Sequence, residues 1–197
     1  MSQTIRLIII FLLVTSCKKE IEIPGYKKIE FNEEITKNQI FKDLNNLPEF
    51  DFKYRFRKIA KNKKRSTNLK IKTELGGLKN VYNEFNTESF FLNDMDEKPT
   101  DTLIIMIDNF DGYSGNGLNL RIYDKFFKTE YIETGDVVIQ NKKKDNIKII
   151  ESNLILNKKR NKINDSVFGF IKLEMIKNEE NIIAEGFFRT IIKKREF

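Results

Sequence analysis

The second half of the chain consists of short segments with strand-like patterning, and this feature limits the fold more than any other. Apolar and polar residues alternate, as in strands with one buried face. We place such strands near residues 89–92, 102–108, 117–124, 128–133, 137–140, 146–151, 153–157, 166–176 and 182–193. Their short connections contain Gly, Asn and Lys, as between adjacent antiparallel strands. No helical segment intervenes, so we predict a mainly β fold, an antiparallel β-sandwich or barrel.

The last two of these strands form the longest predicted hairpin, which turns at residues 177–181. Gly169 and Gly186 fall within them. A glycine inside a strand usually marks a bulge or a close approach of another backbone. We therefore expect a sharply coiled hairpin.

The first half predicts one or two short helices beside two further strands. A first strand is expected over residues 27–31, and a short helix should end before Pro48. Thr36 and Gln39 have capping-box spacing. The apolar residues that follow at helical intervals are Ile40, Phe41, Leu44 and Leu47. A second helical turn or two is expected over residues 78–85, after Gly76 and Gly77.

Residues 50–57 show the clearest alternation, with four aromatic side chains on one face of a predicted strand. We expect this strand to form a hairpin with residues 69–75, with the basic residues 61–65 in the loop. Aromatic and basic residues also interleave in sheets that bind single-stranded RNA. We interpret the aromatic row as core and expect no nucleic-acid partner.

Composition supports a folded domain and excludes several kinds of catalytic site. The 197 residues are 40% hydrophobic and 33% charged, with 17 Phe and 6 Tyr available for a core. The chain has no His and one Cys. Ser-His-Asp and Cys-His nucleophiles, His-bearing zinc sites and intrachain disulfides are therefore excluded. We predict no catalytic residues, no metal site and no cofactor.

The N-terminus has the order of a secretory signal: Arg6, then the apolar residues 7–14, then small residues. The eight apolar residues would extend only roughly 12 Å as a helix, too short to cross a membrane of ~30 Å. Leu13, Val14, Thr15, Ser16 and Cys17 closely resemble the lipobox of bacterial lipoproteins. That resemblance implies cleavage before Cys17 and a diacylglycerol thioether on its sulfur.

This resemblance divides the chain into a signal peptide (1–16), a lipidated tether (17–25) and one β-rich domain (26–197). Lys18, Lys19 and Glu20 resemble the charged start of lipoproteins in Gram-negative bacteria, and the absence of Asp there favours the outer membrane. Residues 165–171 and 184–190 resemble the terminal hairpin of uncharacterised small lipoproteins, a likeness that implies no known chemistry.

One internal segment, residues 108–117, has the composition of a binding loop. Its candidate ligand-binding residues are Asp108, Asn109, Asp111, Tyr113 and Asn116. Oxygen ligands and glycines are what a calcium loop uses, but the spacing does not fit an EF-hand. We favour a plain hairpin loop over a binding loop.

Charged residues provide two further candidate sites. Basic clusters at residues 61–65, 142–144, 158–162 and 193–195 are interpreted mainly as solvated turns and a solvated terminus, with attraction to an anionic surface as the alternative. The acidic pairs Asp108 with Asp111 and Glu130 with Glu133 could support hydrolysis without His. Glu130 and Glu133 would point to opposite faces of their strand.

These observations favour a lipid-anchored, non-enzymatic binding or interaction module in the cell envelope. Its expected partners are the membrane, through the lipid on Cys17, and an unknown protein or envelope ligand. The alternatives are an immunity or inhibitor lipoprotein against a toxin and a His-free carboxylate hydrolase.

Overall fold

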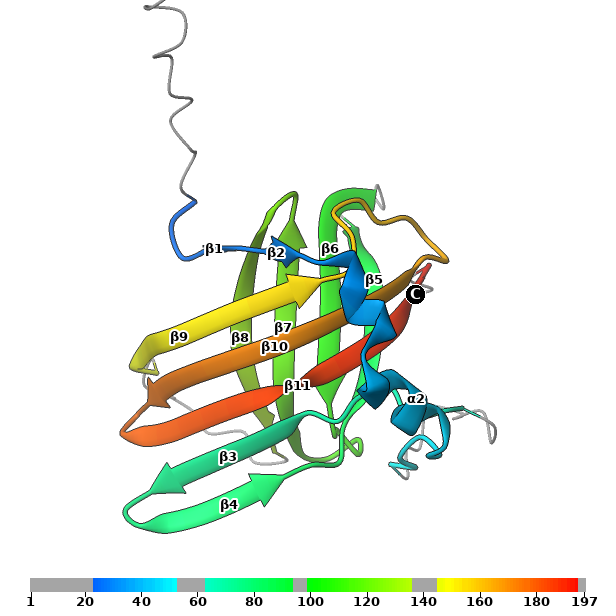
Figure 1. Ribbon diagram of the computed structural model, residues 1–197. Coiled ribbons are helices and arrows are strands. Elements are labelled where there is room, and N and C mark those ends of the chain that lie inside the picture. Colours follow the sequence, from blue (N-terminus) through cyan, green and yellow to red (C-terminus); the bar gives the residue numbers. More distant parts are fainter. Residues whose placement is uncertain (1–22, 53–62, 94–98, 136–144, 195–197) are drawn as a thin grey trace, which may run out of the picture.

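The computed structural model describes residues 23–52, 63–93, 99–135 and 145–194, and its fold is mainly β (Figure 1). The elements are β1 (Lys27–Lys28), β2 (Glu30–Phe31), the 3-10 helix η1 (Glu33–Lys37), α2 (Gln39–Asn45), β3 (Lys70–Leu75), β4 (Leu78–Tyr82), β5 (Asn86–Asn93), β6 (Pro99–Asp108), β7 (Gly115–Tyr123), β8 (Phe126–Thr134), β9 (Ile147–Leu156), β10 (Ser166–Lys177) and β11 (Glu180–Lys193). The predicted mainly β class, with short helical elements in the N-terminal half, is confirmed.

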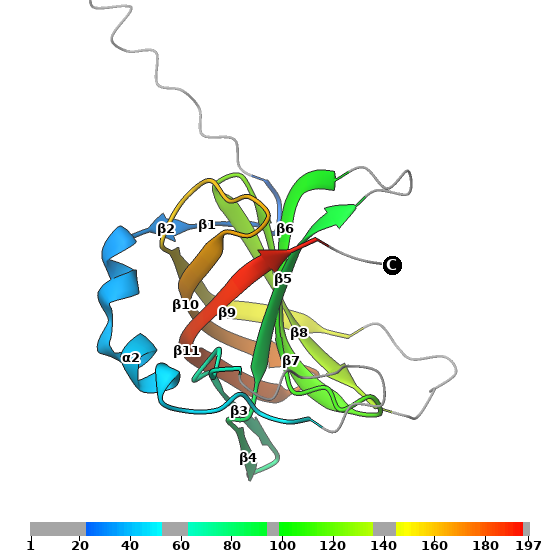
Figure 2. The same cartoon turned by 90° about the vertical axis from the view of Figure 1, so that its right-hand side faces the viewer.

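The strands form a nearly closed barrel that has two walls. Sheet 1 has the order β1-β8-β7-β6-β5, and sheet 2 has the order β2-β9-β10-β11-β3-β4. The strands of the two sheets cross steeply in Figure 1, and Figure 2 shows how they curve around a common interior. The pairings are antiparallel except for β11 with β5 and β2 with β9, which are short and parallel.

The long strand β11 joins the two sheets. One of its edges pairs with β10 over the whole length of that strand. The other edge pairs first with β3, from Asn181 to Glu185, and then with β5, at Ile192 and Lys193. Its inward residues are buried at alternate positions, as period two requires.

The N-terminal segment joins the sheets on the opposite side of the barrel. Lys27 and Lys28 pair with β8, and the Ile29 amide donates a hydrogen bond of 2.9 Å to the Lys125 carbonyl. After Ile29 the chain crosses to β9, where the Asn32 amide donates to the Leu156 carbonyl at 2.9 Å. This segment therefore bridges the free edges of β8 and β9.

The close backbone approach expected at the strand glycines of the last hairpin is found at Gly186, whereas Gly169 is packed against side chains. A Cβ atom on Gly169 would lie 2.3 Å from the ring of Phe188, its cross-strand partner. A Cβ atom on Gly186 would lie 2.5 Å from the Cα atom of Leu69. Asn178 and Glu179 turn the hairpin with φ of 50° and 75°, within the predicted turn.

The helix predicted over residues 78–85 is wrong, because this segment begins with strand β4. Gly76 and Gly77 adopt positive φ and form a tight turn, so the chain reverses onto β3. Leu78 and Val81 are exposed, at 76% and 60%. Their helical spacing therefore reflects no buried helical face.

Residues 50–52 are not in a strand, which contradicts the predicted strand start. Phe50 and Phe52 are half-buried and stack on each other at 6.0 Å, and Arg65 lies over the Phe50 ring at 3.9 Å. Neither belongs to a buried core cluster. The predicted partner of β3 is replaced by β4. Residues 53–57 lie outside the described residues.

The two strands predicted at residues 146–157 are one strand, β9, with an irregularity opposite Glu174 and Met175. Ser152, the residue between the two predicted strands, faces inward and lies 3.4 Å from the Thr129 hydroxyl. The predicted strand at 137–140, residues 1–22 with Cys17, and the basic residues 142–144 lie outside the described residues.

We predict that Phe188→Ala lowers the free energy of unfolding by ~3–5 kcal/mol, because the ring is fully buried and covers Gly169. Denaturant midpoints on the chain from Lys18 onward, which contains all described residues, measure this loss. Leu78→Ala, at an exposed position in β4, should change stability by no more than ~0.5 kcal/mol. Equal midpoints for the two variants would contradict the packing described.

Candidate functional site

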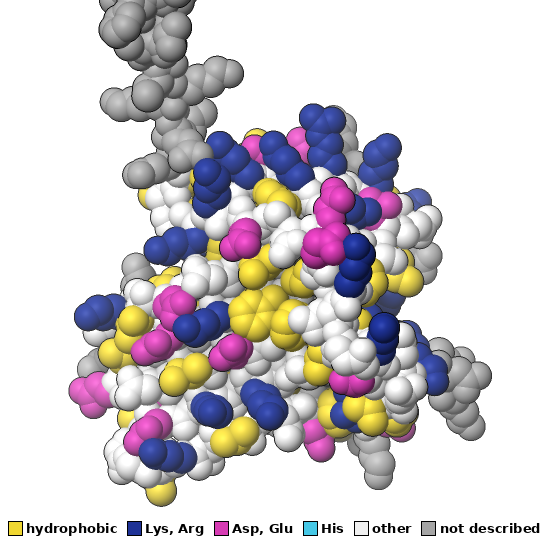
Figure 3. All heavy atoms as spheres, in the orientation of Figure 1, with side chains coloured by type: hydrophobic (Ala, Val, Ile, Leu, Met, Phe, Trp, Pro, Cys, Tyr) yellow, Lys and Arg dark blue, Asp and Glu magenta, His cyan; other side chains and the backbone are white. Residues whose placement is uncertain are grey.

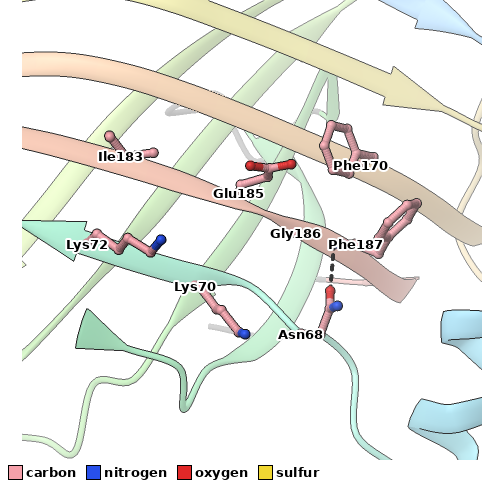
Figure 4. A pocket seen from close by; sticks show the side chains of 8 residues that line it. All are labelled: Asn68, Lys70, Lys72, Phe170, Ile183, Glu185, Gly186 and Phe187. Atoms are coloured by element: carbon pink, nitrogen blue, oxygen red, sulfur yellow. Dashed lines mark hydrogen bonds between the residues drawn. The ribbon is translucent and has the colours of Figure 1, made fainter.

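The outer face of sheet 2 carries a groove with an aromatic floor. Two hollows of about 250 and 490 Å³ meet there and share Phe170 and Phe187. Figure 3 shows hydrophobic side chains in the middle of this face, with charged side chains around them. We call the two joined hollows the aromatic groove. The part drawn in Figure 4 is lined by Asn68, Lys70, Lys72, Phe170, Ile183, Glu185, Gly186 and Phe187.

The floor exists because β10 and β11 carry aromatic residues on their outward face. Phe170 and Phe187 are cross-strand partners, with ring centroids 4.9 Å apart. Such a pair contributes ~0.5–1.5 kcal/mol beyond its buried area. Phe168 continues the row and packs edge to face on Phe41 at 5.0 Å. The row is thus partly covered and partly open.

Helix η1, with Asn32 and Asn38 at its ends, forms one wall of the groove, and α2 packs on the sheet directly after it. Phe41 and Leu44 of α2 are buried against this face, with Ile35 of η1. Asn32 and Asn38 cap the two helices, each accepting a hydrogen bond of 3.0 Å from a backbone amide. The helices therefore begin at fixed points above the sheet.

A polar network fixes the end of α2 to β11. The Arg189 guanidinium donates to the Asn45 side chain and, at 2.8 Å, to the Arg65 carbonyl. Nearby, Glu49 accepts hydrogen bonds from the amide and hydroxyl of Ser66. Burial raises the pKa of Glu49 and lowers the pKa of Arg189.

The opposite wall is the start of β3. Because Gly186 has no side chain, Leu69 approaches β11 closely, and Asn68 turns outward over the strand. The Asn68 side chain accepts a 2.7 Å hydrogen bond from the Phe187 amide, drawn as a dashed line in Figure 4. This bond holds the wall against the aromatic floor.

Charged side chains line the groove beyond Asn68. Lys70 and Lys72 are exposed and form no ion pair with a described residue. Glu185 lies between Lys70 and Lys172 in the cross-strand register. Lys172 is itself 2.7 Å from Glu151, which raises the pKa of the lysine. Lys70 and Lys72 are therefore available to a ligand carboxylate.

The predicted binding loop is held together by several hydrogen bonds among its own residues, whereas the side-chain oxygen of Asn116 is buried without a hydrogen-bond partner among the described residues. The Asp111 carboxylate accepts 2.9 Å hydrogen bonds from the amides of Tyr113 and Ser114, which lower its pKa. Asn109 accepts a 2.7 Å bond from the Asn116 amide. Asp108 lines a separate hollow of about 200 Å³ with Asn116. These bonds are those of a structured hairpin loop.

The other sequence candidates are separated in space. Glu130 contacts Arg121 and Lys128 on the outer face of sheet 1, whereas Glu133 lies 3.3 Å from the buried Lys177. They point to opposite faces, as expected. Of the basic clusters, residues 158–162 are fully described and lie in the connection between β9 and β10.

Sequence reasoning missed the aromatic groove, although a signal was present. Residues 167–171 read Val-Phe-Gly-Phe-Ile, with no polar residue between the inward ones. A strand of this kind is apolar on both faces. Its outward phenylalanines indicated either a covering element or an exposed apolar site.

Comparison with protein-family models, curated proteins and solved structures finds no match for the chain. Among the described residues, no helix is long and apolar enough to cross a membrane. The described ranges also contain no group of three or more acidic or cysteine side chains placed to hold a metal ion.

We predict that Phe41→Ala releases η1 and α2 from sheet 2 without unfolding the barrel. Phe41 is central to the smaller apolar cluster, which is separate from the barrel core. Hydrogen exchange should accelerate in residues 33–45 while β6 and β7 stay protected. The exposed neighbour Lys42→Ala is the control. Loss of protection throughout the barrel would show that the two clusters unfold together.

Proposed function

We propose that this protein is a lipid-anchored, non-enzymatic binding module of the Gram-negative cell envelope, attached through Cys17. The supporting sequence is the lipobox-like Leu13 to Cys17, preceded by a short apolar segment. Two or three acyl chains at one residue give firm attachment, whereas one chain gives marginal binding. Lys18, Lys19 and Glu20 favour the outer membrane as the site of attachment.

The aromatic groove is the observation that carries the binding role. Its two joined hollows lie between η1 and β3, an arrangement that suits an extended segment of a partner protein. Phe170 and Phe187 offer a surface for a large apolar side chain. Lys70 and Lys72 favour an acidic residue next to it. The proposed ligand is therefore an extended protein segment with an apolar anchor and an acidic neighbour.

The lipid attachment is tested with Cys17→Ala in cells fed a fatty-acid analogue. The wild-type chain should incorporate the label and migrate as a cleaved protein. The variant should stay unlabelled and uncleaved, because Cys17 supplies the chain's only thiol. Label retained by the variant would refute this attachment.

The groove is tested by photo-crosslinking in intact cells. A crosslinking residue at Ile183, which is 40% exposed in the groove, should capture a partner protein. The same residue at Ile150, which is 51% exposed in β9 outside the groove, is the matched control.

Combining Lys70→Glu and Lys72→Glu should reduce capture at Ile183 by roughly tenfold, as expected for two surface ion pairs of ~0.7 kcal/mol each. Neither lysine forms an ion pair with a described residue, so the barrel should stay folded, with a small loss of stability from the like charges of residue 70 and its cross-strand partner Glu185. Equal capture at both sites, or capture at Ile183 that ignores the two substitutions, would contradict the proposed ligand.

A further inference from the structure

The tether enters the barrel at one end. The first described residue, Ile23, is six Cα steps from Cys17, so an extended tether spans at most roughly 22 Å. The chain then reaches β1, and Ile29 bonds to Lys125 in the turn between β7 and β8. Figure 1 shows the start of the described chain, in blue, at this end. If Cys17 is lipidated, this end is held close to the membrane.

The basic connection between β9 and β10 lies at the same end. Lys159 is 3.6 Å from Asp124, which is in the same β7–β8 turn that Ile29 contacts. Leu156, where this connection begins, accepts a hydrogen bond from the Asn32 amide. We call β1, the β7–β8 turn and residues 157–165 together the tether end.

Positive charge dominates the described residues of the tether end. Its basic residues are Lys27, Lys28, Lys125, Lys158, Lys159, Arg160 and Lys162. The acidic residues around them are Glu30, Asp101, Asp124 and Asp165. Figure 3 shows a row of Lys and Arg side chains along this end. The sequence between β5 and β6 adds three acidic residues and one lysine at 94–98, outside the described residues.

Of the four cations in the β9–β10 connection, two are uncommitted within the described structure. Asp165 is 2.7 Å from Lys158, and Asp124 is paired with Lys159. Arg160 and Lys162 are exposed and form no ion pair with a described residue. Their charge is therefore available to an external anion.

Apolar surface accompanies the charge. A hollow of about 690 Å³ is lined by Lys159, Arg160 and Lys162, and the core residues Leu103 and Ile122 lie at its base. Tyr123 and Ile163 stand at its rim, 46% and 45% exposed. Basic, aromatic and aliphatic side chains together are typical of surfaces that lie on lipid headgroups.

We propose that the tether end binds anionic phospholipid headgroups, with Arg160 and Lys162 as the principal cations. This inference rests on the proposed lipid anchor, which brings the surface within reach of the membrane. This contact sets the orientation of the barrel relative to the bilayer. An acidic partner protein at this end is the competing occupant.

The test uses the full lipidated chain reconstituted in vesicles, with Ile163→Cys carrying a dye. Cys17 is blocked by its thioether, so the new thiol is the single labelling site. Vesicles contain phosphatidylcholine alone or with about 30% phosphatidylglycerol, plus a spin-labelled headgroup lipid as quencher. Quenching should be several-fold stronger with phosphatidylglycerol, and about 0.5 M NaCl should abolish the difference.

Arg160→Gln with Lys162→Gln should remove this difference, since each cation near the surface accounts for about a fivefold change in binding. Lys42→Gln with Lys148→Gln, which neutralises two exposed lysines on other elements, should leave it intact. A dye on Leu78→Cys, in the exposed strand β4, should show no dependence on lipid charge. Equal quenching at Ile163 in both vesicles overturns the proposal and favours a protein occupant.

Flotation separates this failure from a failure of the anchor. A lipidated chain floats with both kinds of vesicle whatever its orientation. A chain without lipid does not float with phosphatidylcholine, and its Cys17 thiol reacts with the dye reagent. If this chain without lipid floats with the vesicles that contain phosphatidylglycerol, the proposed binding of anionic headgroups is still supported. If it floats with neither kind of vesicle, that proposal is overturned.

Discussion

The pairing of β11 with three other strands is the constraint on which the rest of the structure depends. One edge holds β10, and the other passes from β3 to β5 as the strand moves from one sheet to the other. Such a strand must coil, and coiling brings neighbouring backbones close together on the inside of the bend. Gly186 admits Leu69 there, and Gly169 admits the ring of Phe188. A side chain at either glycine would push apart the two elements that β11 joins.

The N-terminal segment closes the other side of the barrel, and this couples the tether to the fold. Residues 27–31 bridge β8 to β9 through short pairings and the hydrogen bonds of Ile29 and Asn32. Force on the tether is therefore carried by the edges of both sheets.

Further along the barrel, Lys177 of β10 also reaches across to Glu133 of β8 and lies over the ring of Tyr131. Burial, with Glu133 nearby, raises the pKa of Tyr131, so its hydroxyl stays protonated beside this pair.

Sequence patterning predicted the strands that bury one face and failed where burial departed from that rule. The last hairpin was predictable because its inward residues alternate over many positions. Strand β4 was missed because Leu78 and Val81 are exposed, so their spacing carried no information about burial. Strand β9 was predicted as two strands, and the residue left between them, Ser152, is a polar residue that faces Thr129 inside the barrel. The meeting of β11 with β5 joins residues that are far apart in the chain, which no local pattern encodes. The groove was missed for the same reason, because its walls come from distant segments.

The order of elements along the chain links the proposed anchor to the groove mechanically. The tether leads into β1 and β2, and η1 and α2 follow at once, so the segment that closes the barrel also forms a wall of the groove. Phe41 of α2 packs on Phe168 and Phe187, and Arg189 of β11 donates a hydrogen bond to Asn45 at the end of α2. A displacement of residues 27–31 would therefore move η1 relative to the aromatic floor. Binding at the membrane end that steadies this segment would also steady the groove, since a preorganised site loses less entropy when a ligand binds.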